Sequence, residues 1–210
     1  MITNAASSIT KAASKQTYYT IRFLADRARV DEAYLRNMMQ VLDFDVRRRG
    51  MLISQSELNE YTRWLAISVT EAMHYFIGHD QPSPQNSSRY LAVTGAHIAH
   101  LLRDTWEDIQ TGYYNIPREF LSANGIGPED VESKPYRAWI GERVNLARAC
   151  FKSGKEYLAQ VKNIRCRIAG YAYMVRFEGV LDVIERQNYR LAPQYPQRHY
   201  GYLTLDISRL

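Results

Sequence analysis

The chain has 210 residues, which is enough to bury the core of one large domain or two small ones. Its 11 glycines, 7 prolines and charged fraction of 23% exclude collagen-like and disordered classes. Lysine and arginine exceed aspartate and glutamate by 27 to 22, and this excess suits an anionic ligand such as a phosphate, a diphosphate or a nucleic acid without choosing among them.

The two cysteines, Cys150 and Cys166, belong to no CxxC pair and to no metal-ligand spacing, so we expect both to be reduced core residues. The first 15 residues lack the apolar core of a signal peptide. No apolar run approaches the roughly 20 residues of a membrane span. The expectation is a cytoplasmic protein.

Helical spacing of apolar residues dominates the chain, and hairpin signals are almost absent. Helices are predicted, in chain order, over residues 9–24, 31–45, 56–77, 89–111, 118–123, about 136–158 and 164–186. A capping box at Ser54 and Glu57 begins the third helix, and Gly78 ends it. Residues 79–88 and the proline-broken tail after residue 190 are expected to be irregular. The predicted fold class is all-α.

The helix predicted over residues 89–111 has two faces. At 100° per residue, His97, His100, Asp104 and Asp108 occupy one arc of about 80°. The other face carries an apolar stripe formed by Ile98, Leu102, Trp106 and Ile109.

Asp104 and Asp108 repel each other at this spacing, so the pair contributes nothing to the stability of the helix. A bound cation reverses the sign of that interaction. Mg²⁺ prefers oxygen ligands and uses one or two carboxylates together with water and substrate phosphate. The spacing therefore permits a metal site, and it equally permits an ordinary solvated polar face.

The segment AHLLRDTWEDIQTGYYNIPREFL, residues 99–121, resembles the second aspartate motif of the squalene/phytoene synthase family, whose usual form reads NILRDVGED. His100 replaces the usual Asn, and Asn115 stands where the family often has Tyr. Three further segments are similar to family segments: SKQTYYTIRFL at 14–24, ELNEYTRWLAISV at 57–69 and VRFEGVLDVIERQNYRL at 175–191. Phe177 lies near the place of a diphosphate-contacting Tyr in some members.

The resemblance implies an all-α, isoprenoid synthase-type helical bundle, with residues 1–210 as a single domain. It also implies a prenyl transferase that joins two prenyl diphosphates head to head with Mg²⁺ or Mn²⁺, in isoprenoid or carotenoid biosynthesis. Carried onto this chain, the metal-binding and catalytic residues are Asp104 and Asp108. The substrate-binding residues are Arg22, Tyr61, Arg103, His97 and His100. The implied substrate is farnesyl or geranylgeranyl diphosphate.

One departure concerns the first aspartate motif, typically within a tract such as FxRxxDDxxD, which the chain lacks. The join near residues 34–37 predicts an internal deletion, so the bundle is incomplete relative to the family. Asp26, Asp31, Asp43 and Asp45 make no Asp-x-x-x-Asp pair and are interpreted as surface or cap residues. Whether the chain catalyses the family reaction is therefore left open.

Two alternatives remain beside the transferase: a non-catalytic binding or assembly module, and a shortened form of an ordinary enzyme. Peripheral membrane association through an apolar product and a homo-oligomer are two further expectations. Nucleic-acid binding is not expected, because the arginines at 47–49 are interpreted as a solvated helix end and no recognised motif accompanies them.

Overall fold

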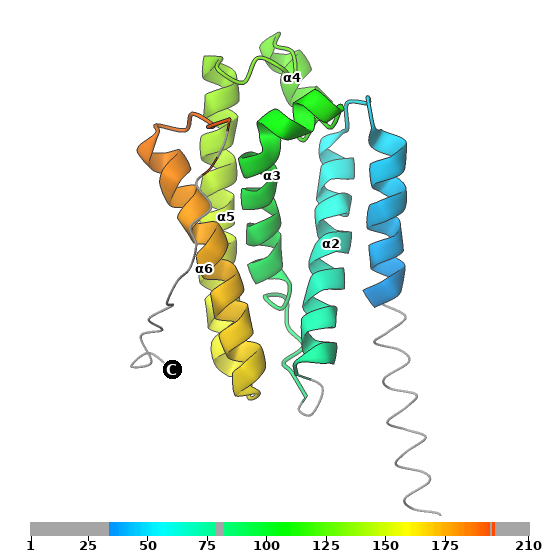
Figure 1. Cartoon of the computed structure of the whole chain (residues 1–210), viewed down its shortest axis with the longest axis vertical. Coiled ribbons are helices and arrows are strands. Elements are labelled where there is room, and N and C mark those ends of the chain that lie inside the picture. Colours follow the sequence, from blue (N-terminus) through cyan, green and yellow to red (C-terminus); the bar gives the residue numbers. More distant parts are fainter. Residues whose placement is uncertain (1–33, 79–81, 194, 196–210) are drawn as a thin grey trace, which may run out of the picture.

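The computed structural model describes residues 34–78, 82–193 and 195. The helix predicted over residues 9–24 and most of the tail lie outside the described residues. A helix covers residues 34–48, here called the 34–48 helix. It is followed by α2 (Gln55–Phe76), α3 (Leu91–Thr111), α4 (Arg118–Asn124), α5 (Lys134–Gln160) and α6 (Ile164–Arg186), as Figure 1 shows.

The sequence signals for the helix ends are confirmed. Ser54 accepts a hydrogen bond from the backbone N–H of Glu57, and the Glu57 carboxylate accepts one from the backbone N–H of Ser54, which completes the capping box of α2. Ser133 and Asn163 are the N-caps of α5 and α6, and the side-chain oxygen of each accepts one hydrogen bond from a backbone N–H of the first turn. α6 has the predicted bounds, and the ends of α2 and α3 lie within two residues of the predicted ones. The agreement is close because caps and apolar spacing are local properties of the sequence.

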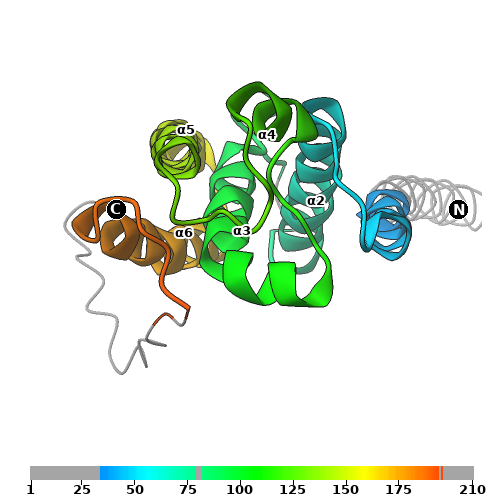
Figure 2. The same ribbon diagram turned by 90° about the horizontal axis from the view of Figure 1, so that it is seen from above.

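The helices pack around α3. Seen from above in Figure 2, α3 lies between α2 on one side and α5 and α6 on the other, and the 34–48 helix stands beyond α2. α3 and α5 approach closely where Gly154 meets Ala92, because a Cβ on Gly154 would lie 2.8 Å from the Ala92 backbone. The all-α class is confirmed for the described residues, whose one β-bridge joins Leu52 and Tyr114.

Apolar side chains form two cores. The larger joins α3, α5 and α6, and includes Leu102, Ile140 and Leu181. The smaller lies between the 34–48 helix and α2 and contains Val41, Phe44, Ile53, Leu58 and Tyr61. The smaller core fixes the 34–48 helix beside the N-terminal half of α2.

Both cysteines are buried and unbonded to each other, as predicted. The predicted stripe of α3 is also confirmed: Ile98 and Leu102 belong to the larger core, and Trp106 and Ile109 pack against it. Among the described residues, no helix combines the length and the apolar content needed to cross a membrane.

Candidate active site

Asp104 and Asp108 lie one turn apart near the C-terminal end of α3, and both are partly buried. α3 ends at Gly112, whose φ of 86° lies in the left-handed region that favours glycine. The chain reverses there and carries Asn115 back against the helix. The turn thus places a side-chain amide beside the second aspartate.

Asp108 is a carboxylate in an unfavourable environment. The Asn115 amide donates a hydrogen bond to its Oδ2 at 2.6 Å. Burial, and after it the negative charge of Asp104, raise the pKa of Asp108 to about 6 against the lowering effect of the Asn115 hydrogen bond. A cation bound between the two carboxylates would stabilise the ionised form of Asp108.

Asp104 has two cationic or polar neighbours. Arg103 donates to both of its oxygens, at 2.5 and 2.7 Å, and His100 Nε2 lies 2.7 Å from Oδ2. Burial raises the pKa of Asp104, but the hydrogen bonds from Arg103 and His100 outweigh burial and hold it well below its ordinary value. The structure therefore brings together four of the predicted residues, His100, Arg103, Asp104 and Asp108.

The basic run at residues 47–49 is not a uniformly solvated helix end, so that interpretation is wrong for Arg48. Its side chain is 6% exposed. Its Nη1 donates to Asn115 Oδ1 at 2.8 Å, and its guanidinium carbon lies 4.8 Å from the Tyr61 ring centroid and 4.9 Å from that of Tyr113. Arg48 thus joins the 34–48 helix to the turn after α3.

Asp45 is not an ordinary surface residue either. It accepts a hydrogen bond from Arg48 Nε at 2.7 Å and another from the Tyr61 hydroxyl at 3.1 Å. A continuous chain of hydrogen bonds therefore runs from Tyr61 through Asp45, Arg48 and Asn115 to Asp108. Burial raises the pKa of Tyr61, which donates within this chain.

His97 and His100 differ sharply in environment. His97 is buried against the edge of the Tyr61 ring, with 5.0 Å between ring centroids, and its Nε2 has no hydrogen-bond partner among the residues that the structure describes. Burial, and after it the nearby His100 and Arg48, lower the pKa of His97 to about 3. His100 is half exposed and stacks on Phe177 of α6 at 6.3 Å.

One predicted substrate-binding residue, Arg22, falls outside the described residues. Within the described part of the chain, no group of three or more His, Cys, Asp and Glu side chains is arranged to hold a metal ion. A cation at Asp104 and Asp108 would thus take its remaining ligands from water, substrate or residues beyond that part.

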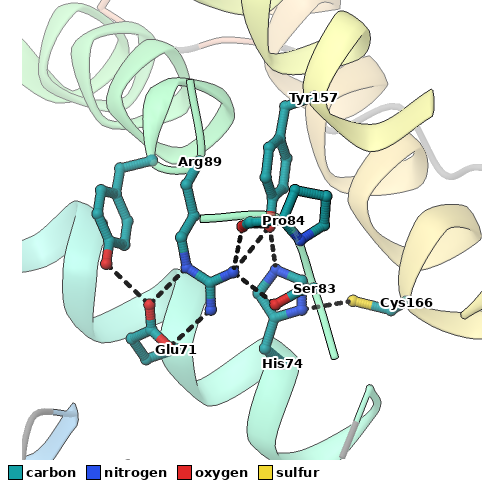
Figure 3. A network of polar contacts seen from close by, with 8 residues as sticks. Glu71, His74, Ser83, Pro84, Arg89, Tyr157 and Cys166 are labelled. Carbon is teal, nitrogen blue, oxygen red and sulfur yellow. Dashed lines mark hydrogen bonds and ion pairs between the residues drawn. The ribbon is translucent and has the colours of Figure 1, made fainter. Parts of the chain in front are cut away.

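A second polar network lies where α3 begins, and Figure 3 shows it. Arg89, with 3% of its side chain exposed, donates to both Glu71 oxygens at 2.7 and 2.8 Å. It also donates to the Tyr157 hydroxyl, which lies 2.9 Å from His74 Nε2, while His74 Nδ1 lies 3.5 Å from Cys166 Sγ. These contacts link α2, α3, α5 and α6.

Comparison with known proteins decides the family. The sequence pattern of the squalene/phytoene synthase family matches residues 4–201. The chain belongs to this family. It is 29% identical over 96 residues to a phytoene synthase from Thermus thermophilus, covering 44% of this chain and 32% of that protein. It is 26% identical over 112 residues to a 15-cis-phytoene synthase from Synechococcus elongatus, covering 51% and 36%.

The fold has a solved counterpart within the family. The structure is similar to that of squalene synthase HpnC from Alicyclobacillus acidocaldarius, with a TM-score of 0.65 and 20% identity. The match covers 76% of this chain and 61% of that one. The chain thus has the fold of the family and spans less than two thirds of each of these relatives.

Sequence reasoning missed Asp45, Arg48 and Asn115 as members of the polar cluster. One signal for Arg48 was present, because Val41, Phe44 and Arg48 lie on one helical face at spacings of three and four residues, and the first two are core residues. The partner of Arg48 follows 67 residues later, and no local pattern reveals it.

Proposed function

We propose that this chain binds a prenyl diphosphate, farnesyl or geranylgeranyl diphosphate, at the Asp104–Asp108 face of α3. The proposed reaction is the head-to-head condensation of two such molecules with release of diphosphate. Membership of the squalene/phytoene synthase family supports the reaction class.

One observation carries the proposal: two carboxylates lie one turn apart, and burial and the charge of Asp104 destabilise the ionised form of Asp108. Mg²⁺ or Mn²⁺ fits this donor set, because both ions accept carboxylate oxygens and keep positions for water and phosphate. Asp104 and Asp108 would hold the ion. When bound, it supplies positive charge that stabilises the diphosphate leaving group.

The other residues have roles that follow from their positions. Arg103 pairs with Asp104 and is proposed to turn its guanidinium to the diphosphate when a cation takes its place. His100 lies on the same face, half exposed, and is proposed to donate to the same group. Tyr61 and His97 form the proposed wall of the prenyl site, and Arg22 is proposed as a further diphosphate ligand.

Residues 1–210 are proposed to form one domain that lacks the helices carrying the first aspartate motif, so further metal ligands are proposed to come from water, from the substrate, from residues outside the described part or from another chain. An apolar product would favour peripheral contact with a membrane surface.

Calorimetric titration with farnesyl or geranylgeranyl thiodiphosphate tests the proposal. We expect binding in the presence of Mg²⁺, loss of binding with chelator, and loss of binding in Asp104→Asn/Asp108→Asn. Asp182→Asn is the matched control, because Asp182 is an exposed helical aspartate on α6 that pairs with Arg148. It should bind as the native chain does.

Two results contradict the proposal. Binding that persists in chelator and in the double variant would place the diphosphate away from α3. No binding by a folded native chain would remove the catalytic interpretation and leave a binding or assembly module. Where binding is metal-dependent, turnover of the natural diphosphate is the next measurement.

A further inference from the structure

A groove with a volume of about 210 Å³ lies between α2, α3 and α5, and we call it the α2–α3–α5 groove. Its apolar lining comes from all three helices and consists of Ala66, Ile67, Ile98 and Leu146. None of the described residues that line the groove is acidic. The groove therefore combines an apolar surface with an absence of negative charge among the described residues around it.

Arg143 of α5 is a cation of this groove without an anionic partner. Its side chain is partly buried, and its guanidinium carbon lies 5.9 Å from the centroid of the Trp139 ring. Among the described residues, it makes no hydrogen bond and no ion pair. The other arginine that lines the groove, Arg63, differs because it pairs with Glu60 at 2.5 Å. The positive charge of Arg143 is thus left for a ligand.

The environment of Arg143 contrasts with that of Arg89. Burial lowers the pKa of Arg143, and the influences of Cys150 and Glu142 do not offset it. Burial also acts to lower the pKa of Arg89, but the hydrogen bonds and charge of Glu71 outweigh burial and raise it. A partly buried guanidinium without a partner is unfavourable, and an anion in the groove would remove that penalty.

We propose that the α2–α3–α5 groove binds a small carboxylate that carries an apolar group. Arg143 holds the carboxylate through two parallel N–H···O hydrogen bonds, the geometry that a guanidinium offers. The apolar group packs against Ala66, Ile67, Ile98 and Leu146. Since a water molecule takes roughly 30 Å³, the groove has room for a ligand of about seven to ten non-hydrogen atoms.

The hydroxyl groups of the groove favour a carboxylate over a bare phosphate. Thr62 Oγ1 donates to a backbone carbonyl of α2 at 2.8 Å, and Thr94 Oγ1 donates to the carbonyl of Tyr90 at 3.1 Å. The Tyr90 hydroxyl donates to Glu71 at 2.9 Å. These three protons are used within the fold. A phosphate needs several donors for its oxygens, whereas one guanidinium satisfies a carboxylate.

The groove is separate from the candidate active site, because neither Asp104 nor Asp108 lines it. The proposal therefore does not rest on the proposed catalysis. It is tested without Mg²⁺ and without any diphosphate, so its failure and the failure of the proposed function are distinguishable.

Calorimetric titration of the full chain with benzoate tests the site, because benzoate joins a carboxylate to a compact apolar ring. We expect saturable binding with a millimolar or lower dissociation constant. Benzamide has nearly the same shape without the charge, and inorganic phosphate has charge without the ring. Each should bind at least about 10-fold more weakly than benzoate, since each lacks one of the two kinds of contact.

Two sets of variants locate the ligand. Arg143→Met should weaken benzoate binding at least about 10-fold, whereas Arg186→Met should leave it unchanged, because Arg186 is an exposed arginine of α6 outside the groove. Leu146 is 43% exposed, so a charge there is tolerated by the fold. Leu146→Glu should bind benzoate at least about 10-fold more weakly than Leu146→Lys, because both lose the same apolar side chain and differ in the sign of the new charge.

Circular dichroism establishes that each variant is folded. The proposal is overturned by a folded native chain that does not bind benzoate, and by benzamide or phosphate that binds as tightly. Binding that survives Arg143→Met, or equal binding by the two Leu146 variants, overturns it as well. Asp104→Asn/Asp108→Asn should bind benzoate as the native chain does, and a loss there would place the carboxylate at the candidate active site instead.

Discussion

A buried guanidinium stabilises a fold only while its partners remain in place, because an unpaired buried charge costs several kcal/mol. Arg48 is such a group, with Asp45 and Asn115 as partners. Replacing Arg48 by methionine keeps an apolar side chain of similar length and leaves Asp45 and Asn115 without this hydrogen-bond donor. We expect Arg48→Met to lower the free energy of unfolding by about 3 kcal/mol, measured by urea denaturation.

The neighbouring arginine provides the control. Arg47 is 61% exposed and pairs only with Asp43 one turn away among the described residues. Exposed pairs of this kind contribute little, so Arg47→Met should change the free energy of unfolding by less than about 0.5 kcal/mol. Equal effects of the two substitutions would show that Arg48 is solvated and that the chain of hydrogen bonds to Asp108 does not form.

At the level of helices, local signals were sufficient for much of the fold. Apolar spacing predicted α6 to the residue and α2 to within one, because caps and amphipathic faces lie within each element. Asp104 and Asp108 were predicted on one face for the same reason. The Tyr61 to Asp108 chain was not predicted, because it joins the 34–48 helix, α2 and the turn after α3, and contacts between distant segments have no period.

In the network of Figure 3, the Arg89–Glu71 ion pair joins α2 to the start of α3, and contacts of Tyr157 and Cys166 extend the network to α5 and α6. Burial raises the pKa of Glu71, but the hydrogen bonds and charge of Arg89 outweigh it and hold that pKa below its ordinary value. We expect Arg89→Met and Glu71→Gln each to lower the free energy of unfolding by about 3 kcal/mol. The double variant should lower the free energy of unfolding by about 2 kcal/mol less than the sum of the two single effects, because the second substitution removes a partner that the first has already left unpaired.

The same cycle on Arg63 and Glu60 is the control, because that pair joins exposed residues of α2 at 2.5 Å. Its coupling should stay below about 1 kcal/mol in urea denaturation. If the Arg89–Glu71 cycle gave a coupling no larger than the exposed cycle, the network would contribute nothing specific to the packing of the four helices.

At the scale of the whole molecule, the buried His74 and His97 and the partly buried Asp108 shape the response of stability to acid. Burial lowers the pKa of His74 to about 4 and that of His97 to about 3, so both stay neutral in the folded chain while the unfolded chain takes up protons below about pH 6.5. Asp108 acts in the opposite sense, because its raised pKa of about 6 makes the folded chain bind a proton that the unfolded chain does not yet hold.

Between about pH 6 and pH 5 the unfolded state therefore holds nearly two protons on its histidines that the folded state lacks, and the folded state holds up to one proton on Asp108 that the unfolded state lacks. Each proton is worth about 1.4 kcal/mol per pH unit, so the native chain should lose about that amount of stability per unit as the pH falls. In Asp108→Asn the loss of stability per pH unit should about double, because the opposing proton on Asp108 is gone. In His74→Gln/His97→Gln the slope should reverse, with stability rising toward pH 5, because only the uptake by Asp108 remains. Urea denaturation at a series of pH values measures all three slopes, and an unchanged slope in the double histidine variant would show that neither imidazole is buried in its neutral form.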